Sequence, residues 1–378
     1  MKQLTILFSL AVLLLMGSCA KEDPFSIDSG DKVIVKYTAK LPDYIDSRAI
    51  GEAECVDQLF FWVFDEQNHE LSALRQRNVS FDANKTATVE VPLTPGHKYS
   101  FAFWAQDKDC EVYNPSTSFI EIDYYDEEGN PYLANDDQRD AFYALETNIE
   151  VSTEGEMVQR EVTLHRPFSQ LNYAISPEAF QAIKDAGVDL TNAKARVYVS
   201  KAYTRFGLLE GQPIETGDNW DEVYFEFNVM PNGVPNDKLE KAKWQEDPEG
   251  EGGTWVAYDW LSFNYFLTTI PESNAEVDFS KITTWIEIET ADGQTFKSQD
   301  FKNVPVKGNK RTNILADFFT TDVTFNIIIS EYFEEPDHNV DVTVNPIAPS
   351  QGPNPKAPLK SNIASYNGIT IPTFNFLK

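Results

Sequence analysis

The sequence predicts an all-β chain built from two sandwich-sized halves with a few short helices. Apolar and polar residues alternate over short segments, which is the pattern of strands with one buried face. Turn-forming Gly, Pro and Asn residues separate these segments, as in β-sandwiches. Phe and Tyr, which suit strands, number 26 and 16. The length of 378 residues is more than one sandwich needs and is enough for two domains.

The segment at residues 32–41 is the clearest strand of the first half. Its residues alternate strictly between an apolar face and a polar face that carries Lys36. The apolar face holds Val33, Val35, Tyr37, Ala39 and Leu41. Ile34 lies on the polar side, so we expect that side to be partly covered. Five more strands are expected at residues 56–64, 87–91, 99–105, 119–123 and 161–164.

The second half begins near Pro167 and repeats this kind of pattern. Seven strands are expected at residues 171–175, 195–201, 223–227, 263–268, 285–289, 296–301 and 311–317, and another at 323–329. Short helices are expected at residues 136–144 and 177–186, the second ending at Gly187. Residues 231–253 predict a long surface excursion.

These patterns divide the chain into segments. We expect an N-terminal β-sandwich at residues 32–165 and a C-terminal one at 166–344. A Pro-rich linker and a tail follow at residues 345–378.

The first 19 residues predict an export signal with a lipid anchor. A basic start precedes an apolar run at residues 4–16, which is too short to span a membrane. Cys19 follows Gly17-Ser18, which resembles a bacterial lipobox, in which the cysteine thiol is acylated. The acyl chains, typically palmitate, would anchor Cys19 in outer-membrane lipid. An ordinary signal peptide with an incidental cysteine is the alternative.

A polar tether follows at residues 20–31. Its opening Ala20-Lys21-Glu22-Asp23 resembles the surface-export signal of Bacteroidales lipoproteins. The alternative is a solvated linker. Together with the lipobox, this segment predicts an outer-membrane lipoprotein displayed on the cell surface.

Charge and composition argue against several classes of function. The formal net charge is −29, from 31 basic and 60 acidic residues, so nucleic acid is not an expected partner. The four histidines and three cysteines show no metal-ligand spacing, and no GxSxG motif occurs. We therefore expect no catalytic residue, no metal and no cofactor, and hence no enzyme. Cys55 and Cys110 could pair outside the cytoplasm or remain two buried thiols, and both readings stay open.

Several short phrases, taken in order, resemble the Bacteroidales fimbrillin-like family. They are FWAQ at 103–106, RDAFY at 139–143, LHRPFSQLN at 164–172, FGLLEG at 206–211, NVPVK at 303–307 and RTNI at 311–314. The resemblance implies two tandem transthyretin-like β-sandwiches. It also implies a structural or adhesive subunit, or an accessory protein, of a type V pilus, with other pilus subunits as partners. Host or bacterial surface ligands are further partners of such an adhesin.

The same resemblance implies assembly by proteolysis-triggered donor-strand exchange. In that family a trypsin-like protease cuts after an arginine behind the first strand, and a neighbour's C-terminal strand fills the groove that opens. Arg48 is the only Lys or Arg between Lys40 and Arg75, so it is the candidate cleavage site. An ordinary loop arginine is the alternative.

The candidate donor strand is the apolar end of the tail. It contains Ile369, Ile371, Phe374 and Phe376, interrupted by Pro372. The family's chains usually end nearer residues 335–345, so this tail departs from the pattern. A disordered tail, or a strand folded back on its own domain, is the alternative.

The runner-up function is a surface glycan-binding lipoprotein. Trp220, Trp244, Trp255 and Trp260 could stack on sugars, although core or loop anchoring explains them as well. The acidic run at residues 123–130 is interpreted as a solvated turn, because it lacks the ligand spacing of a calcium loop. The pair Glu246-Asp247 is read in the same way, and His165-Arg166 is interpreted as junction packing.

Overall fold

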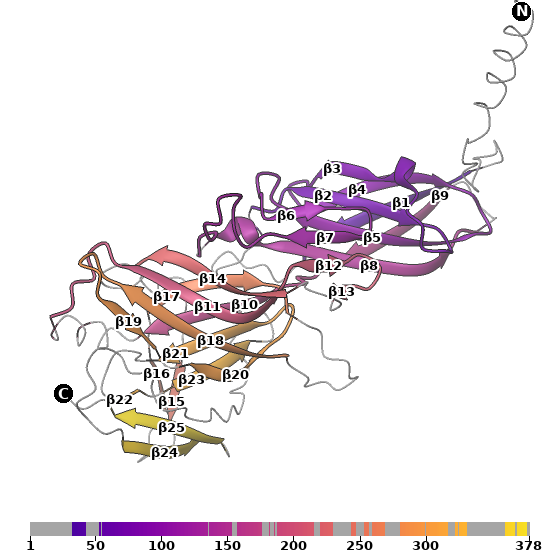
Figure 1. Cartoon of the computed structure of the whole chain (residues 1–378). Helices are drawn as coiled ribbons and strands as arrows, with labels where there is room; N and C mark the ends of the chain where they lie inside the picture. The colour runs from indigo at the N-terminus through magenta and orange to yellow at the C-terminus, as the bar shows by residue number, and fades with distance from the viewer. Residues whose placement is uncertain are drawn as a thin grey trace, which may run out of the picture.

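The computed structural model shows a chain that is nearly all β, as the sequence predicted (Figure 1). It describes residues 32–42, 53, 55–134, 136–152, 157–175, 181, 185, 187–214, 220–229, 243–246, 253–256, 259–268, 280–298, 300–316, 322–323, 325–330, 360–366 and 369–375. Within these ranges, no helix has both the length and the apolar character of a membrane span.

Two sheets form the first half. The first has the order β4 (Thr86–Leu93), β1 (Val33–Lys40), β9 (Met157–Thr163). The second has the order β3 (Gln76–Ser80), β2 (Gln58–Phe64), β5 (Lys98–Gln106), β8 (Ala141–Glu150). One apolar cluster joins the two sheets, with Val35 and Tyr37 from β1 against Phe61, Phe101 and Phe103 from the second sheet. The first half is therefore a sandwich, and β1 supplies part of its core.

Two sheets also form the second half. One has the order β17 (Asp259–Phe266), β10 (Ser169–Ile175), β21 (Arg311–Ala316), β23 (Phe325–Ser330). The other has the order β14 (Trp220–Asn228), β11 (Lys194–Tyr203), β18 (Ser280–Glu289), with β19 (Thr295–Lys297) and β20 (Phe301–Val306) both pairing with β18. Tyr173 of β10 and Ile314 of β21 share an apolar cluster with Val197, Phe225 and Ile286 of the second sheet.

A small sheet joins the two halves. Its order is β13 (Gln212–Pro213), β12 (Arg205–Gly207), β7 (Phe119–Ile122), β6 (Tyr113–Pro115). β6 and β7 belong to the first half and β12 and β13 to the second. The apolar cluster of the second half continues through this sheet to Trp104 of β5, whose ring lies 5.7 Å from Phe206 and 5.9 Å from Phe168. The apolar cluster of the second half thus extends across the junction onto the first half, whereas the core between the two first-half sheets is a separate cluster.

The remaining elements are short. β15 (Lys243–Glu246) lies in the excursion expected at residues 231–253 and pairs with β16 (Gly253–Val256), which begins at its last residue. β22 (Asp322–Val323), β25 (Ile369–Asn375) and β24 (Lys360–Tyr366) form a three-stranded sheet, in which β24 and β25 are drawn in yellow in Figure 1. The described helical turns include two 3-10 turns, Ser72–Leu74 and Asp137–Arg139.

Two expectations about individual elements were wrong. The helix expected at residues 136–144 is a single 3-10 turn, after which β8 begins at Ala141. Phe142 of β8 enters the first-half core and Tyr143 the other apolar cluster, so both faces are buried and the alternation that marks a strand is missing. The strand expected at 296–301 is divided between β19 and β20. Of the helix expected at 177–186, only residues 181 and 185 are described, and both are helical.

Candidate functional site: the β1 slot

β1 occupies the central position of its sheet, between β4 and β9. We call this position the β1 slot. β1 pairs antiparallel with β4, from Val33 opposite Leu93 to Lys40 opposite Thr86. It also pairs in parallel with β9, from Ile34 opposite Met157 to Lys40 opposite Thr163. Loss of β1 would therefore leave two strand edges with unpaired backbone groups facing each other.

The inner face of β1 fills the core of the first half. Val33, Val35, Tyr37, Ala39 and Leu41 are all buried, and none is more than 5% exposed. Burying a side chain as large as Val or Leu contributes about 1.5–3 kcal/mol. The whole face, with its one small residue, is therefore worth on the order of 10 kcal/mol. An empty β1 slot would be a deep apolar groove.

Tyr37 lies at the centre of this face. Its ring is 4.9 Å from Phe101 and 5.2 Å from Phe103, centroid to centroid, and the Phe103 contact is edge-on. Edge-on and tilted aromatic pairs contribute energy beyond their buried area. Tyr37 is therefore the main anchor of β1 in the opposite sheet.

A polar network supports the same tyrosine. The Tyr37 hydroxyl donates a hydrogen bond of 2.6 Å to Oε2 of Glu146 on β8. Arg160 of β9 donates to both carboxylate oxygens of Glu146, at 2.9 and 3.2 Å. This Tyr37–Glu146–Arg160 network connects β1, β8 and β9 through side chains alone.

The network shifts the protonation equilibria of its members. Burial, reinforced by the neighbouring Glu146 carboxylate, raises the pKa of Tyr37. Burial also acts to raise the pKa of Glu146, but the hydrogen bonds from Arg160 and Tyr37 outweigh it, so this pKa is lowered. The carboxylate therefore remains charged and keeps its acceptor oxygens for Tyr37 at neutral pH.

The outer face of β1 is half-buried, including Ile34, as expected. Lys36 on this face forms an ion pair of 3.2 Å with Glu90, its cross-strand neighbour on β4. At the end of the strand, Leu41 N–H donates to Lys85 O at 3.1 Å, and Leu164 N–H donates to Lys40 O at 2.9 Å. These bonds hold the C-terminal end of β1 on both of its sides. Arg48 and Cys19 both lie outside the described residues.

The candidate donor strand is placed as a strand but is already paired. β25 lies between β24, with Ile369 opposite Tyr366, and β22, with Phe374 opposite Val323. To donate a strand to another chain, β25 would have to leave both pairings. Phe376 lies outside the described residues.

The contacts of Arg166, next to His165, are those of a residue that packs the junction between the halves. Arg166 is buried and its Nε and NH2 groups donate to the two Asp140 oxygens, both at 2.7 Å. The Arg166 guanidinium also lies 4.5 Å from the Phe142 ring centre. This pairing orients the start of β10 against the first half.

The other residues raised by the sequence lie in ordinary structural settings. Asp126 closes the acidic turn by accepting from the Asn130 backbone N–H at 2.7 Å. In the described part of the chain, no three His, Cys, Asp or Glu residues gather as a metal site. Cys55 and Cys110 are both thiols in this structure, and burial raises the pKa of Cys110 to about 11.

Trp220, Trp244, Trp255 and Trp260 lie on four different strands. These strands are β14, β15, β16 and β17, and Trp244 and Trp255 are opposite each other in the hairpin. The side chains of these four tryptophans are not among those described. Whether they stack on sugars, as in the runner-up function, or anchor core and loops is therefore not tested by this structure.

The sequence could not have indicated the Tyr37–Glu146–Arg160 network. Tyr37 and Glu146 are 109 residues apart and meet only because two sheets stack. The one available signal was Tyr37 itself, a hydroxyl-bearing aromatic on a face that is otherwise aliphatic, because a buried tyrosine hydroxyl usually finds a hydrogen-bond partner.

Comparisons with known proteins give a family and a set of distant structures. Residues 32–350 match the model described as "Family of unknown function (DUF6562)". A search of the curated proteins finds no match. Among solved structures, the chain is similar to the tip fimbrial protein Mfa3 from Porphyromonas gingivalis. The identity is 14% and the TM-score 0.40, and the alignment covers 80% of this chain and 100% of that one.

Two further structures are similar to the same degree. The fimbrial anchor protein Mfa2 from Porphyromonas gingivalis has 12% identity and a TM-score of 0.39, over 79% of this chain and 98% of that one. A putative adhesin from Bacteroides thetaiotaomicron has 9% identity and a TM-score of 0.42, over 79% and 96%. At such identities, the role of the chain has to be argued from its own geometry.

Proposed function

The chain belongs to the family of unknown function DUF6562, and from the geometry of the β1 slot we propose that it is a surface fibre subunit that assembles by strand replacement. The observation that carries this proposal is the position of β1. It is a central strand with one apolar face, flanked by β4 and β9, so its departure leaves a groove that another strand can fill. Backbone hydrogen bonds would give strength and alternate side chains would give fit, as in β-augmentation.

The trigger is cleavage after Arg48. The cut chain begins at Ala49, and β1 is then held by contacts alone. Because these contacts are worth on the order of 10 kcal/mol, cleavage by itself does not expel β1. It does remove the covalent tether that keeps β1 at high effective concentration, so a strand from another subunit can compete for the slot.

The remaining parts of the proposal come from the sequence. The chain is exported as a lipoprotein, acylated on Cys19 and displayed on the outer membrane of a type V pilus-forming cell of the Bacteroidales. Its domains are the sandwiches at residues 32–165 and 166–344. The tail that contains Ile369 and Phe374 supplies the donor strand, and other pilus subunits are its partners. Together these features describe a fimbrillin-like stalk, tip or anchor subunit, not an enzyme.

The experiment is controlled proteolysis of the mature chain. After treatment with a trypsin-like protease, N-terminal sequencing should give Ala49 as the new first residue. The trimmed protein should form ladders on unheated SDS gels. Arg48→Ala should stay uncut and monomeric, and a chain truncated after residue 344 should be cut but form no ladder. Trimmed wild-type protein that remains monomeric at high concentration would refute assembly by strand replacement.

A further inference from the structure

A cavity of about 360 Å³ lies where the two halves meet. One wall comes from β7 and the turn after it in the first half, and the other from the ends of β12 and β14 in the second. The lining residues are Glu121, Ile122, Asp123, Tyr124, Tyr125, Thr204, Arg205 and Asp221. This volume falls toward the lower end of small-molecule sites, which span about 300–1,000 Å³.

Hydrogen bonds between the halves hold these walls in place. Ile122 N–H donates to Thr204 O at 2.8 Å, next to the antiparallel pair of Glu121 and Arg205. The buried Tyr124 hydroxyl donates to Tyr203 O and accepts from Leu267 N–H, both at 3.0 Å. The cavity is therefore preorganised, which lowers the entropic cost of binding.

The lining combines hydrogen-bond acceptors, donors and an aromatic ring. Arg205 donates to Glu121 at 3.1 Å, and Asn114 donates to one oxygen of Asp123 at 2.6 Å. Asp123 and the exposed Asp221 also line the cavity, and their carboxylate oxygens are hydrogen-bond acceptors. Such planar polar groups suit a ligand with several hydroxyls, each of which can donate and accept.

The charge of the lining residues restricts the class of ligand further. Three carboxylates and one guanidinium line the cavity, so the lining carries excess negative charge. Burial, and then the nearby Glu121, raise the pKa of Asp123, which agrees with a site that disfavours further negative charge. A neutral ligand fits this lining better than an acidic one.

Tyr125 supplies the aromatic wall. It is half-buried, its hydroxyl accepts from Tyr224 N–H at 3.2 Å, and its ring meets Tyr224 edge-on at 5.7 Å. These contacts fix the ring at the cavity without closing the cavity. The apolar C–H face of a sugar ring packs well on such an aromatic side chain.

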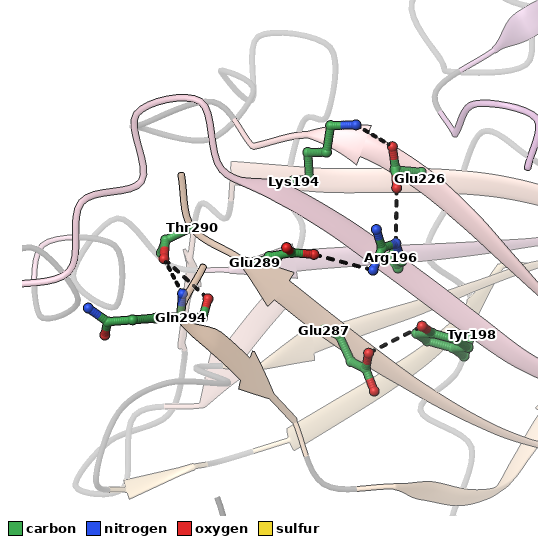
Figure 2. A network of polar contacts seen from close by, with 8 residues as sticks. All are labelled: Lys194, Arg196, Tyr198, Glu226, Glu287, Glu289, Thr290 and Gln294. Carbon is green, nitrogen blue, oxygen red and sulfur yellow. Dashed lines mark hydrogen bonds and ion pairs between the residues drawn. The ribbon is translucent and has the colours of Figure 1, made fainter. Parts of the chain in front are cut away.

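On the nearby outer face of the sheet β14-β11-β18, the described rings are packed against neighbouring side chains. The Trp285 ring is stacked on Tyr198 at 4.7 Å and 7°, and Lys297 lies 4.5 Å from its centre. Figure 2 shows the same face crossed by ion pairs and hydrogen bonds, among them Arg196 to Glu226 and Tyr198 to Glu287. The described polar and aromatic groups of that face pack against one another, whereas those of the cavity, although partly paired as well, line an open volume.

We propose that this cavity binds a neutral mono- or disaccharide unit of a glycan. Asp123 and Asp221 accept from the sugar hydroxyls and Tyr125 packs against the ring. The site goes beyond the assembly role, because it uses neither β1 nor the tail. A chain that failed to assemble would still bind sugar, and an assembling chain without sugar affinity would leave the assembly role intact.

The test is a titration of the full mature chain, by saturation-transfer NMR and calorimetry, with neutral hexoses, N-acetylhexosamines, their disaccharides and the matching uronic acids. We expect saturable binding of at least one neutral sugar, and at least tenfold weaker binding of its uronic acid. Asp221→Asn and Asp123→Asn should each weaken binding about tenfold, because each replaces a charged hydrogen-bond acceptor with a weaker neutral one.

The control is Glu150→Gln, which changes an exposed carboxylate on β8 that does not line the cavity and should leave affinity unchanged. The side-chain amide introduced by Asp123→Asn can still accept from Asn114, so this variant should keep its fold, which thermal unfolding verifies. The proposal is overturned if no neutral sugar binds, if binding survives both cavity variants, or if uronic acids bind more tightly.

Discussion

β1 and β10 hold the same place in the two halves. Each is the first strand of its half, and each lies between an antiparallel partner and a parallel partner. The partners are β4 and β9 for β1, and β17 and β21 for β10. Comparing them shows which features would let a partner strand replace β1, as proposed, but not β10.

The faces of the two strands differ. β1 alternates between buried and half-buried residues. Five successive residues of β10, Ser169 to Tyr173, have no exposed area at all. Asn172 of β10 donates to Asn313 at 2.8 Å, and Asn264 donates to Leu171 O at 3.1 Å. A strand that replaced β10 would have to satisfy these buried amides, whereas one that replaced β1 needs mainly alternating apolar residues.

The surroundings of the two strands differ as well. β21, the parallel partner of β10, is paired on its other side by β23, whereas β9 is an edge strand among the described residues. The start of β10 is held by Asn309 N–H to Phe168 O at 2.9 Å and by the Arg166–Asp140 pair. Gly308 packs so closely on Pro167 that an added Cβ would lie 2.8 Å from its carbonyl oxygen. β1 and β10 have the same pairing pattern. Whether a partner strand can replace either one therefore depends on which of its faces are buried and on whether its neighbours are edge strands.

The largest expected effect is at the anchor of β1. Tyr37→Ala removes a buried aromatic and the hydrogen bond to Glu146, so it should lower the free energy of unfolding by about 3–5 kcal/mol. Urea unfolding measures this change. Thr38→Ala, on the half-buried face of the same strand, is the control and should cost about 1 kcal/mol or less. Equal losses at the two positions would mean that the inner face does not hold β1.

The second prediction compares a polar-to-apolar substitution on β10 with one on β1. Asn172→Leu keeps the branched side-chain shape and the number of heavy atoms but leaves Asn313 without its donor, so it should cost about 1–3 kcal/mol. Thr38→Val on β1 makes a comparable polar-to-apolar change and should be neutral or slightly stabilising. Chemical denaturation of both variants makes the comparison. If Asn172→Leu leaves the free energy of unfolding unchanged, the buried amides do not distinguish β10 from β1.

The third prediction concerns the stability of the fold at low pH. The pKa of Glu146 is held below its ordinary value of 4.5, so its charge stabilises the fold fully above that pH. This contribution is lost as the pH falls through the lowered pKa. Glu146→Gln should therefore cost about 1 kcal/mol near neutral pH, a modest value because the carboxylate is partly exposed. The difference from wild type should shrink as the pH falls through the lowered pKa of Glu146. Thermal melts across pH test this, and a constant difference would contradict the role of the charge.

The smallest effect is on the outer face of β1. Lys36→Ala breaks an exposed pair with Glu90 and should change stability by about 0.5 kcal/mol or less. The change should vanish at high salt, because exposed pairs are screened. Denaturation at two salt concentrations measures it. If Lys36→Ala destabilised the fold as much as Tyr37→Ala, the outer face of β1 would hold the strand as strongly as the inner face.

Much of this architecture could be predicted from the sequence, and the exceptions have physical causes. The alternation of residues 32–41 indicated β1 and its buried face, because one side meets a core and the other meets solvent. β8 was missed because both of its faces are buried near its start, where Phe142 and Tyr143 enter different clusters. The cavity around Asp221 was missed because its walls come from segments about 80 or more residues apart, brought together only by the pairing of β7 with β12.

The most direct measurement of the central claim adds β1 back as a separate peptide. A chain that begins at Ala49 is refolded with a synthetic peptide of residues 32–42, and binding is followed by calorimetry and thermal unfolding. We expect saturable one-to-one binding and a higher melting temperature, and no binding of the same peptide carrying Tyr37→Asp. If the shortened chain does not bind the wild-type peptide while its second half remains folded, the β1 slot cannot be refilled. Assembly by strand replacement would then be wrong.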